Sequence, residues 1–222
     1  MSLQEQLAEG AGSLGVEISP PARQKMLDYL ELLEKWNRVY RLTAISESSQ
    51  AVSHHLLDSL AVLPFVEASP LLDVGSGGGM PGIPLAIARP DLRVVLIDSN
   101  SKKAAFLQQV AIELALGNIA VHCGRVEAYQ PTLRFAAITA RAFADLGTLV
   151  SSSRHLLQAG GRWLAMKGLR PDEEIARLPA GVRLAGVHRL PVPGVGGERH
   201  LVVIESEAAA CRGESRWQQY SQ

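Results

Sequence analysis

The residues best suited to chemistry form a glycine-rich segment that directly follows a short apolar run. The segment reads Asp73-Val-Gly75-Ser-Gly77-Gly-Gly79-Met-Pro-Gly82. Glycines allow a tight turn and let the backbone approach a ligand closely. Without a ligand, each of three consecutive glycines would cost about 0.5 to 1 kcal/mol of chain entropy for no structural gain. The segment from Gly75 to Gly82, hereafter the glycine loop, therefore predicts a ligand site between a strand and a helix.

Two nucleoside-containing ligands fit the glycine loop, and the charges that they carry distinguish them. The spacing of Gly77, Gly79 and Gly82, with Asp98 about 20 residues downstream, matches a dinucleotide fingerprint and keeps a nicotinamide-dependent oxidoreductase open. Asp73 argues against it, because a carboxylate there would face a pyrophosphate. S-adenosylmethionine has no phosphate and carries an ammonium and a sulfonium, which a carboxylate attracts. Asp73 therefore favours S-adenosylmethionine, with a carboxylate that only caps the loop as the structural alternative.

A second carboxylate, Asp98, ends the apolar run from Val94 to Ile97. At the end of a strand, a carboxylate can accept hydrogen bonds from both ribose hydroxyls of a nucleoside. Either candidate ligand contains such a ribose. Asp98 therefore supports a nucleoside without choosing between the two.

Several kinds of methyl transfer lack their characteristic residues in this chain. Exocyclic amine methylation typically uses an Asp/Asn-Pro-Pro-aromatic loop, and the corresponding segment reads Thr139-Ala-Arg141-Ala-Phe143. Carbon-5 pyrimidine methylation needs a nucleophilic cysteine, usually after proline, whereas Cys123 follows His122 and Cys211 lies near the C-terminus. A nitrogen with its own lone pair, such as guanine N7, needs neither device, because alignment alone reaches effective molarities of about 10⁵ M or more. We therefore assign no catalytic residue.

From Leu71 onward, short apolar runs alternate with helical stretches, which predicts an α/β fold with a doubly wound, Rossmann-like sheet of seven strands. The segment from Pro191 to Gly197 has no room for a helix, so the last two strands should form an antiparallel hairpin. We place the cofactor-binding domain at residues 69–206 and a polar tail at 207–222. The predicted strands are Leu71–Val74, Val94–Asp98, Ile119–His122, Phe135–Thr139, Arg162–Met166, Arg183–Arg189 and His200–Ile204.

The first 68 residues predict an N-terminal helical cap. Ser19 followed by Pro20 is typical of a helix start. Apolar residues then recur at the three- and four-residue steps of one buried helix face. They are Met26, Tyr29, Leu30, Leu33, Trp36 and Tyr40, and a second helix is expected through Val52, Leu56, Leu60 and Leu63.

Composition limits the classes of function. Lysine and arginine number 22, as do aspartate and glutamate, so charge gives no reason to propose nucleic acid. The longest apolar stretch, Ala61 to Val66, is far too short for a membrane span. The first residues lack the features of an export signal, which predicts a cytoplasmic protein. The two cysteines have no metal-ligand spacing and His54 and His55 point apart on a helix, so no metal is expected.

Several motifs are spread along the chain. They are Trp36-Asn37, the glycine loop, Asp98 to Leu107, Arg125-Val126-Glu127, Arg141-Ala-Phe143 and Gly197 to Ile204. Together they resemble one known family, which is rRNA small-subunit methyltransferase G, also called glucose-inhibited division protein B. The resemblance covers about residues 20 to 205 and is far more specific than a glycine loop alone. One departure is Gly78, where many members carry proline or alanine.

This resemblance implies a class I methyltransferase that transfers methyl from S-adenosylmethionine to N7 of a guanosine in the decoding-region loop of bacterial 16S rRNA. The partner is then 16S rRNA or the small ribosomal subunit, and we expect a monomer. The family's cofactor contacts correspond to Gly75, Met80, Val126, Glu127 and Arg141. To these the residue-level argument adds Asp73, Gly77 and Asp98.

Basic residues outside the glycine loop are weaker candidates for RNA contact. Lys167 follows the fifth predicted strand, and Arg199 and His200 precede the seventh, where phosphates could approach. Arg38, with Tyr40 and Arg41, combines charge with a ring at the end of the cap helix, although Tyr40 is also expected on the buried face. Arg141 could orient the methionine carboxylate, touch the target base or form a salt bridge. A non-catalytic RNA-binding regulatory module stays open as a further alternative.

Overall fold

The computed structural model describes residues 2–43 and 48–207 and is built around a seven-stranded sheet in the order β3-β2-β1-β4-β5-β7-β6. Strands β3, β2, β1, β4 and β5 are parallel, and β7 runs antiparallel to both β5 and β6. The α/β sheet and its terminal antiparallel hairpin are thus confirmed. The strands are β1 (Leu71–Val74), β2 (Val94–Asp98), β3 (Ile119–Cys123), β4 (Phe135–Arg141), β5 (Leu157–Lys167), β6 (Val182–Arg189) and β7 (His200–Ser206).

The largest error in a predicted strand boundary concerns β5, which begins at Leu157 rather than Arg162. Along β4, the pairing partner jumps from Leu157 opposite Phe135 to Arg162 opposite Ala137. The intervening residues form an irregular stretch in which Gly160 has a φ of 73°. This irregularity breaks the apolar pattern from which the strand was predicted.

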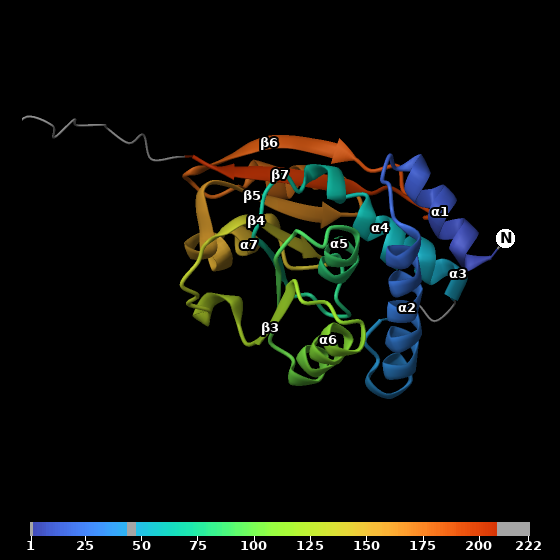
Figure 1. Cartoon of the computed structure of the whole chain (residues 1–222). Coiled ribbons are helices and arrows are strands. Elements are labelled where there is room, and N and C mark those ends of the chain that lie inside the picture. The colour runs from blue at the N-terminus through green and yellow to red at the C-terminus, as the bar shows by residue number, and fades with distance from the viewer. Residues whose placement is uncertain (1, 44–47, 208–222) are drawn as a thin grey trace, which may run out of the picture.

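Helices cover both faces of the sheet (Figure 1). One face packs against α5 and α6 together with the N-terminal cap, and the other packs mainly against α7. Side chains of β1 alternate between these faces, with Leu71 in the core shared with the cap and Leu72 and Val74 in the other. The helices of this part are α5 (Gly82–Ala88), α6 (Ser101–Glu113), η3 (Val126–Ala128), α7 (Leu146–Ser153), η4 (Arg154–Leu156) and α8 (Asp172–Ala176).

The cap is helical, as predicted, and lies at the right of Figure 1. Leu7, Met26 and Leu60 of the cap are fully buried in the same core as Phe106 of α6. Helix α2 begins where the sequence predicted, with the Ser19 hydroxyl accepting from the Ala22 amide at 3.4 Å. Helix α1 was not identified from the sequence. The cap elements are α1 (Leu3–Ser13), α2 (Pro20–Tyr40), α3 (Ser48–Ala51), the π-helix η1 (Val52–Leu57), α4 (Asp58–Leu60) and η2 (Leu63–Phe65).

The second predicted cap helix has a more complex form. It runs from Ser48 to Leu60 through the wide π turn of η1, and Leu63 belongs to the separate short helix η2. No helix within residues 2–43 or 48–207 is both long and apolar enough to cross a membrane. Apart from Glu207, the predicted polar tail lies outside the described residues, as does Cys211.

Candidate functional site

The glycine loop connects β1 to α5, as predicted, and has a backbone that few residues could adopt. Gly79 has a φ of 97°, and a Cβ there would lie 2.3 Å from Ile83 Cδ1. A Cβ on Gly82 would lie 2.3 Å from Leu96 Cδ2 and 2.8 Å from Asp73 Oδ2. These two glycines let the loop turn tightly against β2 and place the start of α5 beside the end of β1.

Asp73 is fully buried at the base of the loop. Its Oδ2 accepts a hydrogen bond from the Gly82 amide at 3.1 Å, so the carboxylate does cap the start of α5. Its Oδ1 is also buried, but accepts no hydrogen bond from any residue in the described part of the chain. Burial raises the pKa of Asp73 to about 7, although the Gly82 amide and the Ser76 hydroxyl lower it in part. The loop therefore holds a carboxylate with unused hydrogen-bonding capacity and no ion-pair partner among the described residues, although the charge of Arg141 also lowers its pKa in part.

Asp98 supports the same loop from the end of β2. Its Oδ2 accepts from the Gly77 amide at 2.9 Å, and its Oδ1 accepts from the Asn100 amide at 2.8 Å. Each carboxylate oxygen has a second lone pair, so both can still accept from a ribose hydroxyl. Asp98 thus fixes the loop and keeps the capacity expected for a nucleoside contact.

The loops after β3 and β4 complete this edge of the sheet. After β3, Val126 is buried and Glu127 is exposed. After β4, Phe143 lies against the glycine loop, since a Cβ on Gly75 would be 3.0 Å from Phe143 Cδ2. The carboxyl ends of β1 to β4 thus converge here, which is where open α/β sheets bind ligands.

The cap also contacts the glycine loop directly. The Tyr29 hydroxyl of α2 donates to the Gly78 carbonyl at 2.5 Å in a buried setting. Burial raises the pKa of Tyr29, which keeps the hydroxyl protonated as a donor. A Cβ on Gly78 would lie 3.2 Å from Leu33 Cδ1. Sequence reasoning placed Tyr29 on a buried face, but gave no sign of its loop contact.

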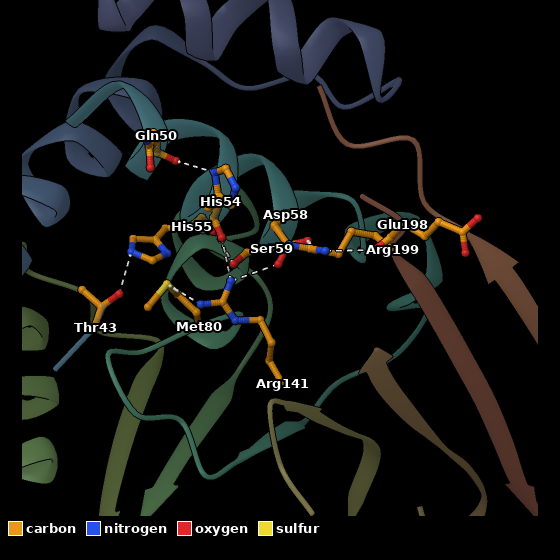
Figure 2. A network of polar contacts seen from close by, with 10 residues as sticks. All are labelled: Thr43, Gln50, His54, His55, Asp58, Ser59, Met80, Arg141, Glu198 and Arg199. Carbon is orange, nitrogen blue, oxygen red and sulfur yellow. Dashed lines mark hydrogen bonds and ion pairs between the residues drawn. The ribbon is translucent and has the colours of Figure 1, made fainter. Parts of the chain in front are cut away.

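Arg141 joins the glycine loop to the cap in the polar network of Figure 2. Its Nη1 donates to the His54 carbonyl at 2.7 Å and to Asp58 Oδ2 at 3.0 Å, and its Nη2 lies 3.1 Å from Met80 Sδ. Two predicted cofactor residues, Arg141 and Met80, are thereby brought together. Asp58 also accepts from Arg199 Nε at 3.2 Å, so Arg199 lies in the same network.

The remaining candidates for RNA contact lie in two places. Near the β5 and β7 ends, Lys167 Nζ pairs with Glu174 at 2.8 Å, and the buried His200 has Nδ1 2.8 Å from the Gly168 carbonyl. At the end of α2, Arg38 pairs with Glu34 at 2.7 Å. The expectation that Tyr40 packs in the core is wrong, because the last turn of α2 leaves it 42% exposed.

The two neighbouring histidines of the cap make separate contacts. His55 is buried, with Nε2 3.1 Å from Thr43 Oγ1, and burial lowers its pKa to about 4. His54 places its Nδ1 3.1 Å from the Gln50 carbonyl. Across residues 2–43 and 48–207, no three histidine, cysteine or acidic side chains group as metal ligands.

The sheet order, the reversed β7 and the glycine loop after β1 define the class I S-adenosylmethionine-dependent methyltransferase fold. Solved structures agree with this class. TrmN from Thermus thermophilus superposes with a TM-score of 0.53 at 19% identity, over 70% of this chain and 53% of that chain. The glycopeptide N-methyltransferase MtfA in complex with S-adenosylmethionine has a TM-score of 0.58 at 12% identity, over 68% of this chain and 94% of that chain.

The chain belongs to the rRNA small subunit methyltransferase G family, whose model matches residues 22–202. The ribosomal RNA small subunit methyltransferase G of Laribacter hongkongensis is 54% identical over 204 residues, covering 92% of this chain and 99% of that protein. Its counterpart from Neisseria gonorrhoeae is 50% identical over 205 residues, with the same coverage. The family resemblance noted in the sequence is confirmed, and the oxidoreductase alternative loses its basis.

Proposed function

We propose that this protein transfers a methyl group from S-adenosylmethionine to N7 of a guanosine in the decoding-region loop of bacterial 16S rRNA. The observation that carries this proposal is membership of the methyltransferase G family over residues 22–202. The glycine loop, with its buried carboxylate at Asp73, is the second support. The RNA substrate follows from family membership and not from composition, because the balanced charge of the chain gives no general basic footprint.

The cofactor site lies at the carboxyl ends of β1 to β4. Its acidic residues suit the cationic methionine end and the ribose, and its glycine backbone allows close approach. When bound, the cofactor supplies an electrophilic methyl group on its sulfonium. The residues assigned to it are Asp73, Gly75, Gly77, Met80, Asp98, Val126, Glu127 and Arg141.

The protein's part in the reaction is binding and orientation. Guanine N7 carries a lone pair and no hydrogen, so the methyl transfer requires no general base. Holding N7 in line with the transferred methyl supplies most of the acceleration, because correct alignment replaces an unfavourable encounter. A site whose fixed backbone orients the donor and the acceptor is suited to this chemistry.

RNA approaches the same edge of the sheet in this proposal. Lys167, Arg199 and His200 occupy the neighbouring ends of β5 and β7, and Arg38 lies on the cap. Phosphate contacts of this kind position an RNA without reading its sequence. The protein acts as a cytoplasmic monomer, and size-exclusion chromatography with light scattering tests the oligomeric state.

The decisive experiment incubates the protein with methyl-labelled S-adenosylmethionine and either unmodified 30S subunits or deproteinised 16S rRNA. Nucleoside analysis should recover the label as 7-methylguanosine. The matched control is Gly75→Asp, which places a charged side chain where the native residue has a φ of 66° and where a Cβ would lie 3.0 Å from Phe143 Cδ2. Label in rRNA without 7-methylguanosine, or no label from a folded wild-type protein on either substrate, would refute the proposal.

A further inference from the structure

A buried carboxylate at the junction of cap and sheet connects two guanidinium groups. Asp58 begins α4, and its side chain is only 4% exposed. Its Oδ2 accepts from Arg141 at the end of β4, and its Oδ1 accepts from Arg199 just before β7. Figure 2 shows Asp58 between the two arginines. A single cap residue therefore holds side chains from two strand ends.

The hydrogen bonds of Arg141 fix how its guanidinium is presented. Both N–H groups of Nη1 are used, one by the His54 carbonyl and one by Asp58. Nη2 has Met80 Sδ as its neighbour, and a thioether is a weak acceptor. Within the described part of the chain, no oxygen accepts from Nε or Nη2. The side-on edge formed by these two nitrogens, which suits a carboxylate in bidentate geometry, is therefore unused.

Charge in this cluster points to the same kind of ligand. Two guanidinium groups share one carboxylate, and their side chains are 22% and 28% exposed. His55 adds no charge near neutral pH, because burial and the nearby Arg141 lower its pKa to about 4. The cluster thus has one positive charge in excess. An anion that reaches the Nε and Nη2 edge next to Met80 would neutralise it.

We propose that Asp58 is a positioning residue for the methyl donor. It engages Nη1 of Arg141 and thereby keeps the side-on edge open for the carboxylate of the donor's methionine end. This inference rests on the proposed function, because it assumes that S-adenosylmethionine binds at the glycine loop. It assigns to the cap an indirect part in the cofactor site, exerted through Arg141.

The test compares two ligands by calorimetry. S-Adenosylhomocysteine contains the carboxylate, whereas its decarboxylated analogue keeps the ammonium and the nucleoside. Asp58→Asn should weaken S-adenosylhomocysteine binding about tenfold and leave the analogue within about twofold of wild type, because the lost orientation concerns only the carboxylate. A purely structural role would weaken both ligands equally, and that result would overturn the proposal.

A double-mutant cycle tests whether Asp58 affects S-adenosylhomocysteine binding through Arg141. If Asp58 acts through Arg141, then Asp58→Asn should add nothing to the loss caused by Arg141→Gln. Additive losses would contradict the proposal. Arg199→Gln is the matched control, since it removes the other partner of Asp58 and leaves Arg141 in place. It should bind S-adenosylhomocysteine within about twofold of wild type, and a loss equal to that of Asp58→Asn would also overturn the proposal.

A substitute variant and the binding of the wild-type protein distinguish a variant that does not fold, a wrong inference and a wrong proposed function. If Asp58→Asn does not fold, Arg141→Lys replaces it, because lysine keeps the charge but has no planar fork. Its loss should again be confined to the ligand with the carboxylate, and equal weakening of both ligands would refute the inference. Failure of the wild-type protein to bind S-adenosylhomocysteine at all would instead refute the proposed function.

Discussion

Replacing Asp73 by asparagine should stabilise the free protein while weakening its cofactor binding. The folded carboxyl has a pKa of about 7, against an ordinary value of 3.8, because it is fully buried. This difference corresponds to at most about 4 kcal/mol. Since the folded pKa is raised, the penalty is absent below pH 3.8 and grows as pH rises to about 7. The ionised form therefore destabilises the folded state most above neutral pH.

Asparagine removes the charge and keeps the contact. Its side-chain oxygen can accept from the Gly82 amide as Asp73 Oδ2 does. We expect Asp73→Asn to raise the free energy of unfolding at pH 8 by about 1 to 4 kcal/mol, with little change at about pH 3.5, below the ordinary pKa of 3.8. Urea denaturation across this pH range measures it. An Asp73→Asn protein less stable than wild type at pH 8 would refute the reasoning.

Cofactor binding should change in the opposite direction. If the ionised carboxylate attracts the ammonium of the ligand, wild-type affinity for S-adenosylhomocysteine should rise with pH until about pH 7. Asp73→Asn should bind more weakly at pH 8 and lose this pH dependence. Calorimetry in buffers of different ionisation enthalpy should show proton release from wild type near pH 6. Equal affinities and equal pH profiles for both proteins would contradict the assigned role.

Three further predictions concern the cap and the loop. Tyr29→Phe leaves the buried Gly78 carbonyl without its donor and should destabilise the protein by about 1 to 3 kcal/mol in urea denaturation. Burial lowers the pKa of His55 in the folded protein, so the stability that His55 contributes is present above pH 6.5 and is lost as pH falls towards 4. The melting temperature of His55→Gln should therefore depend less on pH in this range. A pH dependence equal to that of wild type would contradict this role of His55. Gly78→Ala places a Cβ 2.9 Å from Met80 Cε, the flexible end of a side chain. Because many family members carry alanine here, denaturation should show a stability change within about 1 kcal/mol, and calorimetry should show an S-adenosylhomocysteine affinity within about twofold of wild type.

The central sheet was predictable because strands such as β1, β2 and β4 are short and largely apolar runs bounded by polar or glycine residues. Parallel strands buried on both faces have this pattern, and the connection from Pro191 to Gly197 was too short for a helix. The glycine loop was predictable for a related reason, since its backbone excludes other residues at positions such as Gly79 and Gly82. In both cases, the structure is determined by residues that lie close together in the sequence.

The residues that the sequence did not reveal act across long separations. Tyr29 reaches a carbonyl 49 residues away, and Asp58 pairs with arginines 83 and 141 residues away. Periodicity places a side chain on a face of a helix, but it does not say which distant atom lies opposite. For Tyr40 the helical spacing wrongly predicted a core position, because the residue is 42% exposed and its ring lies against Trp36 and Lys102. Partners of this kind depend on tertiary packing.

The two buried carboxylates of the site differ in a way that bears on function. Asp58 is neutralised within the protein by two guanidinium groups. Asp73 has amide and hydroxyl neighbours and no ion pair among the described residues, and its pKa stays raised although the charge of Arg141 also lowers it in part. A charge buried without a counter-ion destabilises the free protein, and a cationic ligand that supplies the counter-ion removes that penalty. Part of the affinity for a cationic methyl donor then comes from relief of this penalty rather than from new contacts. The instability at Asp73 and the preference for a positively charged ligand are, on this argument, two consequences of the same buried carboxylate.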